Sequence, residues 1–198
     1  MKLLIGTANQ GKTIEISAAL KDSGLELVMP ADLGVFEQPS EDFDTLRENA
    51  LHKARFYRGR GGLATIAEDT GLFVEAISDE LGVKTRRWGA GPDATDAEWL
   101  AHFLARMEPH ANRAAKFVAV VAYIDAEGNE SVFEGEARGQ ILREPRAEYL
   151  PGLPVSSVFL PDGYDRVFSA LTHEEKNALS HRGKALKLFL EHLRRRAA

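Results

Sequence analysis

The stretch KLLIGTANQGKTIEISAALKDSG, residues 2–24, decides the fold that we expect. Its apolar start, Lys2 to Gly6, predicts a short buried strand, and the polar residues from Thr7 to Gly11 predict a turn. A helix is expected from Lys12 to about Ser23, followed by a second strand from Leu25 to Met29. The chain therefore begins with strand, helix and strand, the unit from which sheets with covering helices are built.

The rest of the sequence continues this mixture of helices and strands. Leu46, Ala50, Ala54 and Tyr57 form one apolar stripe at helical spacing, and Asp44 is a candidate N-cap for that helix. The expected elements are helix Thr45–Tyr57, strand Leu63–Ala67 running into EDTG, helix Asp93–Met107, a hairpin of strands Phe117–Ile124 and Glu130–Arg138 around the turn DAEGN, a helix whose capping box pairs Thr172 with Glu175, and a last helix capped by Ser180. This order predicts a mixed sheet in an α/β or α+β domain, rather than eight regular strand–helix units.

Length and composition limit the classes of protein to consider. The chain has 198 residues, enough for one domain with a sizeable core. Its net charge of −5 gives no global basic field for nucleic acid, so a polyanion must be bound by local groups. The absence of cysteine excludes disulfides, zinc–thiolate sites and a cysteine nucleophile. No apolar run approaches the roughly 18 to 20 residues of a membrane span, and MKLLIG is too short for a signal peptide, so we expect a cytoplasmic protein without a membrane partner.

Residues 6–13, GTANQGKT, match the Walker A pattern at every fixed position. A glycine-containing turn between a strand and a helix can bind phosphate, because backbone N–H groups and the helix N-terminus face the anion and a lysine neutralises it. A polar turn with an exposed lysine is the alternative. A P-loop NTPase also needs a Walker B aspartate, and the candidate, Asp125, falls in the predicted hairpin turn. We therefore expect a phosphate-binding turn outside the P-loop fold.

Glu68 and Asp69 are adjacent where the third strand is expected to end and a turn to begin. Two neighbouring carboxylates repel each other unless one is protonated or a cation lies close to both. Oxygen-only ligands suit Mg²⁺, and Glu41 in the preceding acidic loop can supply another. A solvated acidic turn is the simpler alternative. Carboxylates, Lys53 and a phosphate turn are together what a phosphoryl-transfer site needs, which favours a Mg²⁺ site.

Four blocks of the sequence resemble the inosine triphosphate pyrophosphatase family. They are TANQGK (7–12), ENALHKA (48–54), AEDTGLFVEA (67–76) and EEKNALSHRGKAL (174–186), in the family's order and at its spacing. The resemblance spans nearly the whole chain. It implies an α/β fold with a mixed twisted sheet and flanking helices, an elongated two-lobed single domain over residues 1–198 with a central cleft, and a homodimer. It also implies a Mg²⁺-dependent hydrolase that converts non-standard purine nucleoside triphosphates such as ITP, dITP and XTP to monophosphate and pyrophosphate.

The resemblance further implies roles for individual residues. Asp69 would be the general base, with Lys12 and Lys53 as catalytic cations. The implied metal ligands are Glu41, Glu68 and Asp69. The implied substrate-binding residues are Thr7, Ala8, Asn9, Gln10, Gly11, Lys12, Lys53, Thr70, Arg87, Lys176, His181 and Arg182, of which Lys176, His181 and Arg182 would line the nucleobase pocket.

Two segments depart from the family's pattern. In GLPVSSVF (152–159), Leu153 stands where the family has an aromatic ring that stacks on the purine, and Ser156 stands where it has an aspartate that contacts the base. In LGVKTRRWGAG (81–91), Trp88 replaces a tyrosine and Arg86 a small residue, so Trp88 is a candidate replacement for the lost ring. A site that selects its base by hydrogen bonds loses that selection when the partner changes.

We therefore expect a nucleoside triphosphate pyrophosphatase of non-standard purine nucleotides. The first alternative is the same chemistry with a changed base preference, because the base-reading segment is rewritten. The rivals from other classes are a nucleotide-binding protein without turnover and a P-loop NTPase or kinase, which would release orthophosphate or transfer a phosphoryl group.

Overall fold

The computed structural model describes residues 1–85, 88–91 and 93–197. A six-stranded mixed sheet has the order β2-β1-β3-β4-β5-β6. β1 pairs in parallel with β2 and β3, whereas β3, β4, β5 and β6 pair antiparallel in succession. The strands are β1 (Lys2–Ile5), β2 (Glu26–Val28), β3 (Thr65–Val74), β4 (Ala114–Ile124), β5 (Glu130–Ile141) and β6 (Phe159–Pro161), and the helices are α1 (Gln10–Leu20), α2 (Leu46–Gly61), α3 (Asp96–Met107), α4 (His173–Leu179) and α5 (His181–Ala197).

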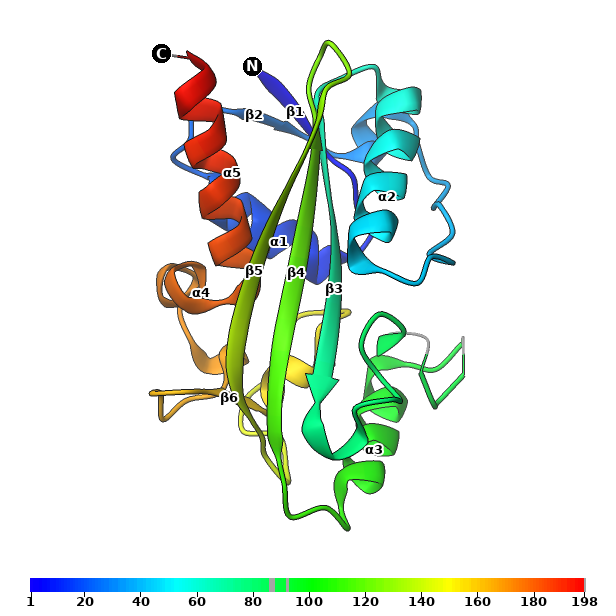
Figure 1. The fold of residues 1–198 in the computed structure, drawn as a ribbon, viewed down its shortest axis with the longest axis vertical. Coiled ribbons are helices and arrows are strands. Elements are labelled where there is room, and N and C mark those ends of the chain that lie inside the picture. Colours follow the sequence, from blue (N-terminus) through cyan, green and yellow to red (C-terminus); the bar gives the residue numbers. More distant parts are fainter. Residues whose placement is uncertain (86–87, 92, 198) are drawn as a thin grey trace.

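Three long strands give the molecule its elongated shape. In Figure 1, β3, β4 and β5 run along the long axis, with α2 on one side of them and α5 on the other. Helices α1, α2 and α5 surround one half of these strands, and α3 and β6 lie beside the other half. The expected α/β fold with a mixed twisted sheet and two lobes is confirmed.

The first strand, turn and helix are close to the prediction, with α1 beginning two residues earlier, at Gln10. The hairpin of β4 and β5 is also confirmed, and Asp125 lies in its turn, where its carboxylate accepts hydrogen bonds from the backbone and side chain of Asn129. Asp125 is thus explained by the turn, as expected. The apolar stripe of α2 is buried against the sheet, although the N-cap is Thr45 rather than Asp44, because the Thr45 hydroxyl accepts from the Glu48 amide.

The prediction that the third strand ends at Ala67 is wrong. β3 continues to Val74 because β4 pairs with it along its whole length, so Asp69 lies opposite Val120 and Gly71 opposite Val118. Gly71 is not a turn residue. A side chain at this position would lie 2.9 Å from the carbonyl oxygen of Gly82, whose segment forms a bridge to Leu72.

Because β3 continues past Ala67, Glu68 and Asp69 lie within the strand. Neighbouring side chains of a strand point to opposite faces of the sheet, so these two carboxylates do as well. Ile66 packs in the core beneath α1 and α5, and Ala67 packs in the core beneath α2. Glu68 continues the first face and Asp69 the second. Because β1 pairs with β3 only as far as Ile66 and the next bridge on this edge joins Leu72 to Gly82, the stretch of β3 between them leaves room for a cavity.

Within the described residues, no helix is long and apolar enough to cross a membrane.

Gly135 should be essential for the close packing of α5 against β5. A side chain at this position in β5 would lie 2.1 Å from the carbonyl oxygen of His181 and 2.7 Å from the amide of Ala185. Forcing a methyl group into that contact should make Gly135→Ala less stable by about 2 kcal/mol, measured by urea unfolding.

Gly59→Ala is the matched control. Gly59 is exposed in α2, and a side chain there would meet nothing within 4 Å. Alanine is the better helix former, so this variant should gain about 0.5–1 kcal/mol. Wild-type stability of Gly135→Ala would contradict the close approach of α5 to β5.

Candidate active site

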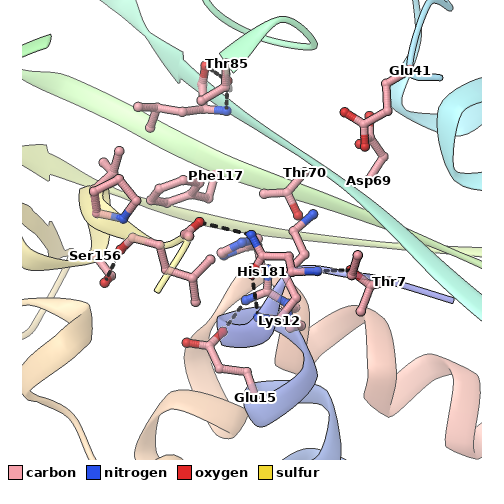
Figure 2. Close-up of a pocket in the computed structure, with 18 of the residues that line it drawn as sticks. Thr7, Lys12, Glu15, Glu41, Asp69, Thr70, Thr85, Phe117, Ser156 and His181 are labelled. Atoms are coloured by element: carbon pink, nitrogen blue, oxygen red, sulfur yellow. Dashed lines mark hydrogen bonds and ion pairs between the residues drawn. The ribbon is translucent and has the colours of Figure 1, made fainter. Parts of the chain in front are cut away.

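A cavity of about 470 Å³ lies beside the open edge of β3. This volume is in the range of small-molecule binding sites. Its walls come from the turn after β1, the 38–41 segment, α2, β3, the short helical turn η4 (Pro154–Ser157), α4 and the start of α5. Figure 2 shows Lys12, Glu15 and Thr7 at one wall, Glu41 and Asp69 at another, and Phe117 and Ser156 at a third.

The turn between β1 and α1 brings Thr7, Ala8, Asn9 and Lys12 to the cavity. Asn9 caps α1, and its side-chain oxygen accepts from the Lys12 amide at 2.9 Å. The Gly11 amide donates to the carbonyl oxygen of Pro151 at 3.0 Å, so it faces the protein rather than a ligand. Neither Gln10 nor Gly11 is among the described residues that line the cavity. Lys12 is thus the positively charged side chain that this turn brings to the cavity, and the Gly11 amide does not face it as a P-loop amide would.

Lys53 joins two of the predicted carboxylates. Its Nζ lies 2.7 Å from Oε1 of Glu41 and 2.7 Å from Oδ1 of Asp69. Burial alone would lower the pKa of Lys53, but the ion pairs with Asp69 and Glu41 outweigh it and raise that pKa. Burial raises the pKa of Asp69 despite the neighbouring lysines. The lysine is therefore charged, and it holds both carboxylates at one point of the cavity.

The same carboxylates fit a divalent metal ion. Oδ2 of Asp69 is buried and has no hydrogen-bond partner among the described residues, which is costly for a carboxylate. Glu41 reaches the same ammonium group, so oxygens of both residues converge on one cation. Such oxygens are the ligands that Mg²⁺ prefers. Within the described ranges, however, no group of three acidic, histidine or cysteine residues is arranged around one metal position.

Glu68 is placed apart from Glu41 and Asp69. It is 2% exposed and is bound in bidentate fashion by Arg182, whose Nε and Nη2 lie 2.5 Å and 2.9 Å from its two oxygens. Lys12 lies 3.6 Å away and the Thr70 hydroxyl also donates to it. Burial would raise the pKa of Glu68, but Arg182 and Lys12 hold it well below the ordinary value. Glu68 is therefore an anchor for two cations in this structure.

Glu15 completes this buried ionic network. It lies three residues after Lys12 in α1, is 4% exposed, and forms ion pairs with both Arg182 and Lys176. The arginine thus bridges two buried carboxylates from different elements, and its pKa is raised by them although burial opposes this. Lys176 and Arg182 are held in fixed positions at the cavity wall.

The other end of the cavity is apolar and aromatic. The ring of His181 stacks on Phe117 with centroids 4.8 Å apart and planes at 14°, and Phe168 lies next to both. Burial and the neighbouring arginine lower the pKa of His181 well below its usual value, so this imidazole is neutral. Leu153, together with Pro154 and Val155 of η4, covers this end. Flat, neutral surfaces of this kind suit a nucleobase.

The cavity thus brings together most of the predicted site residues: Thr7, Ala8, Asn9, Lys12, Glu41, Lys53, Asp69, Thr70, Lys176, His181 and Arg182. Arg87 lies outside the described residues. The suggestion that Trp88 replaces the lost stacking ring is wrong, because Trp88 packs against Trp99 and His102 of α3 and is absent from the described cavity wall.

Sequence reasoning missed Glu15, Thr85, Trp99, Phe117 and Phe168, all of which line the cavity. A signal existed for Glu15, since a carboxylate three residues after Lys12 shares its side of the helix. The aromatic residues carried no such signal, because their spacing is that of ordinary core positions.

A cationic and acidic end joined to a neutral aromatic end defines a binding site for a nucleoside phosphate. Comparison with known proteins agrees. The family model described as the Ham1 family matches residues 3–192, and this chain belongs to that family.

Relatives match over nearly their full length. A dITP/XTP pyrophosphatase of Corynebacterium efficiens is 39% identical, with 96% of each chain covered. The structure of a HAM1 protein from Coxiella burnetii superposes with a TM-score of 0.82 at 30% identity, covering 98% of this chain and 99% of that one. A nucleoside-triphosphatase and dITP/XTP pyrophosphatase structure from Mycobacterium abscessus gives a TM-score of 0.68 at 39% identity, covering 96% and 99%. The resemblance inferred from the four sequence blocks is confirmed.

The buried network should respond strongly to the loss of one charge. Glu15→Gln leaves Arg182 and Lys176 short of a partner, so it should lower the free energy of unfolding by about 3 kcal/mol. Glu130→Gln breaks a partly exposed pair with Arg55 and should cost about 1 kcal/mol or less. Urea unfolding of both variants measures the difference, and equal losses would contradict the structural role of Glu15.

Proposed function

We propose that this protein is a nucleoside triphosphate pyrophosphatase that hydrolyses non-standard purine nucleotides such as ITP, dITP and XTP to the monophosphate and pyrophosphate. The observation that carries this proposal is the single cavity in which Lys53 joins Asp69 and Glu41 next to Lys12, with the aromatic compartment of His181 and Phe117 at its other end. The names of the full-length relatives, dITP/XTP pyrophosphatases, support the same assignment.

The residues suggest how the reaction proceeds. A water molecule attacks the α-phosphorus, a new P–O bond forms, and the bond to the oxygen that bridges the α- and β-phosphates breaks. Asp69 orients this water and accepts its proton, a role for which a buried carboxylate with an unpartnered oxygen is suited. Lys12 and Lys53 stabilise the negative charge that develops on the leaving pyrophosphate, and such preorganised electrostatics should be the largest contribution to the rate.

Mg²⁺ is the proposed cofactor. Glu41 and Asp69 would hold it, because their oxygens converge at the Lys53 ammonium. Glu68 was predicted as a third ligand from the resemblance, and its contacts with Arg182 and Lys12 favour an anchoring role instead. When bound, the ion neutralises phosphate charge and polarises a phosphoryl oxygen.

The apolar compartment bears on base preference. Leu153 and Ser156 replace the stacking ring and the aspartate of the family pattern, and the Ser156 hydroxyl donates to the Leu153 carbonyl oxygen at 2.6 Å. The same chemistry with a shifted base preference is therefore the nearest alternative. A non-catalytic binding protein is disfavoured, because pure binding has no use for a buried carboxylate directed at the phosphate end.

Three further expectations stay predictions: a homodimer and a single catalytic domain over residues 1–198, which the resemblance implies, and a cytoplasmic location, which was expected from the sequence features.

Product analysis over a nucleotide panel tests the assignment. With Mg²⁺ present, ITP, dITP and XTP should give monophosphate and pyrophosphate, while ATP and GTP are left largely intact. Hydrolysis of other nucleotides with the same products would place the protein among the enzymes with a shifted base preference. Orthophosphate with diphosphate, or no turnover on any nucleotide, would refute the proposed function.

Asp69→Asn should separate catalysis from binding. Loss of the proton acceptor should lower kcat about 10³-fold, whereas the affinity for ITP, measured calorimetrically, should change little. Removal of divalent ions with a chelator should abolish turnover of the wild type, and added Mg²⁺ should restore it. Asp22→Asn, at an exposed position after α1, is the matched control and should behave as the wild type. Full turnover of Asp69→Asn would overturn the assigned role.

A further inference from the structure

Tyr57 lines the cavity and has no part in the reaction described above. It is the last residue of the apolar stripe of α2, is 2% exposed, and packs in a core cluster with Leu4 and Val35. The neighbouring ring of Phe56 meets its ring edge-on, with centroids 5.1 Å apart. This packing accounts for an aromatic ring at the position but not for its hydroxyl group, since a phenylalanine would pack in the same way.

The hydroxyl group of Tyr57 is open to a ligand. Among the residues that the structure describes, none forms a hydrogen bond with it, although tyrosine hydroxyls inside proteins usually have a partner. Its oxygen nevertheless keeps accessible surface. Because the residue is otherwise enclosed and borders the cavity, that surface opens into the cavity. An oxygen atom of a bound molecule can therefore reach the hydroxyl.

Tyr57 lies at the end of the cavity that holds the phosphate turn and Lys53. Lys53 is one helical turn earlier in α2, and residues four apart share one side of a helix. The tyrosine ring lies against Gly6, directly before the phosphate turn, since a side chain at Gly6 would be 2.7 Å from Cδ2 of Tyr57. Burial raises the pKa of the hydroxyl, on which nearby Lys53 and Glu41 act in opposite directions. The hydroxyl is therefore protonated and able to donate.

The order of contacts along β3 separates Tyr57 from the aromatic end. Gly6, which the tyrosine ring contacts, donates its amide hydrogen to the carbonyl oxygen of Ile66 at 2.7 Å. Asp69 follows three residues later, and the position opposite Phe117 three residues after that. Strand residues rise by about 3.3 Å each, so Asp69 lies about 10 Å along the strand from either level. A nucleotide with its α-phosphate at Asp69 and its base at Phe117 therefore extends its other phosphates toward Tyr57.

We propose that the hydroxyl of Tyr57 donates a hydrogen bond to the pyrophosphate part of the substrate and holds it as the leaving group. This inference rests on the proposed function. An ionised phosphate oxygen accepts hydrogen bonds, and a bond to a charged oxygen is stronger than one between neutral groups. The phenol adds this contact without a further charge, next to a Lys53 that is already bound to two carboxylates. Tyr57 is thus a substrate-binding residue for the leaving group.

The test compares how a variant binds the two products, pyrophosphate and IMP, by calorimetric titration in the presence of Mg²⁺. Tyr57→Phe keeps the ring and removes only the hydroxyl. Its affinity for pyrophosphate should fall about 10-fold, because one hydrogen bond to a charged group is lost, whereas its affinity for IMP should stay within about 2-fold. The value of kcat/KM for ITP should also fall about 10-fold.

Unfolding in urea distinguishes binding from a structural role. The hydroxyl has no partner in the described part of the protein, so its removal should leave the free energy of unfolding unchanged or slightly higher. A hydroxyl that supported the fold would cause a loss of stability when removed. Weaker pyrophosphate binding together with a clear loss of stability would therefore overturn the inference.

Tyr123→Phe is the matched control. Tyr123 is also a buried tyrosine, 3% exposed and packed against Phe189 with centroids 5.1 Å apart, but it lies outside the described cavity wall. This variant should bind pyrophosphate as the wild type does. An equal loss of affinity in both variants, or wild-type affinity of Tyr57→Phe, would overturn the role of Tyr57.

The outcomes separate the inference from the proposed function, because pyrophosphate can be titrated without turnover. A wild type that releases no pyrophosphate from any nucleotide would refute the function itself. A wild type that does release it, with a Tyr57→Phe variant that loses the same factor for pyrophosphate and IMP or loses none, would refute only the role of Tyr57.

Discussion

The site depends on two adjacent carboxylates of β3 that are buried on opposite faces of the sheet. Glu68 and Asp69 face opposite sides of the sheet, and each is bound by a cation from a different helix, Arg182 from α5 and Lys53 from α2. Neither carboxylate could be buried alone, since an unpaired buried charge is strongly destabilising. The pairing also fixes both helices relative to the strand, so Glu68 and Asp69 hold two walls of the cavity in place.

The balance of these charges supports the proposed metal ion. The four basic residues that line the cavity are Lys12, Lys53, Lys176 and Arg182. The acidic residues are Glu15, Glu41 and Asp69, which line it, and Glu68, which is buried behind them. The cavity is thus nearly neutral, and the phosphates of a nucleotide bring more negative charge than the lysines can offset. Carboxylates at the phosphate end would repel the substrate, unless a cation lies close to both. The aromatic end needs no charge, in keeping with a neutral His181 on Phe117.

Much of the fold could be predicted from local patterns in the sequence, and most of the candidate site residues from the resemblance of four sequence blocks to a known family. Apolar spacing and turn residues are visible in the sequence alone, and they predict the turn after β1, the apolar stripe of α2 and the hairpin around Asp125. The length of β3 could not be predicted, because it is set by pairing with β4, and EDTG is read as a turn when considered alone. Because of that error, the placement of Glu68 and Asp69 on opposite faces of the sheet was not predicted either. Trp99 was missed because only tertiary packing shows that it reaches the cavity, whereas the position of Glu15 three residues after Lys12 was a signal that was overlooked.

In the proposed reaction, a water molecule oriented by Asp69 attacks the α-phosphorus. Hydrolysis of ITP in ¹⁸O-labelled water, with mass spectrometry of both products after single turnover, tests it most directly. Attack at the α-phosphorus should leave one labelled oxygen in the monophosphate and none in the pyrophosphate. Label in the pyrophosphate would mean attack at the β-phosphorus, and labelled orthophosphate would mean attack at the γ-phosphorus; either result would contradict the assigned reaction and the role given to Asp69.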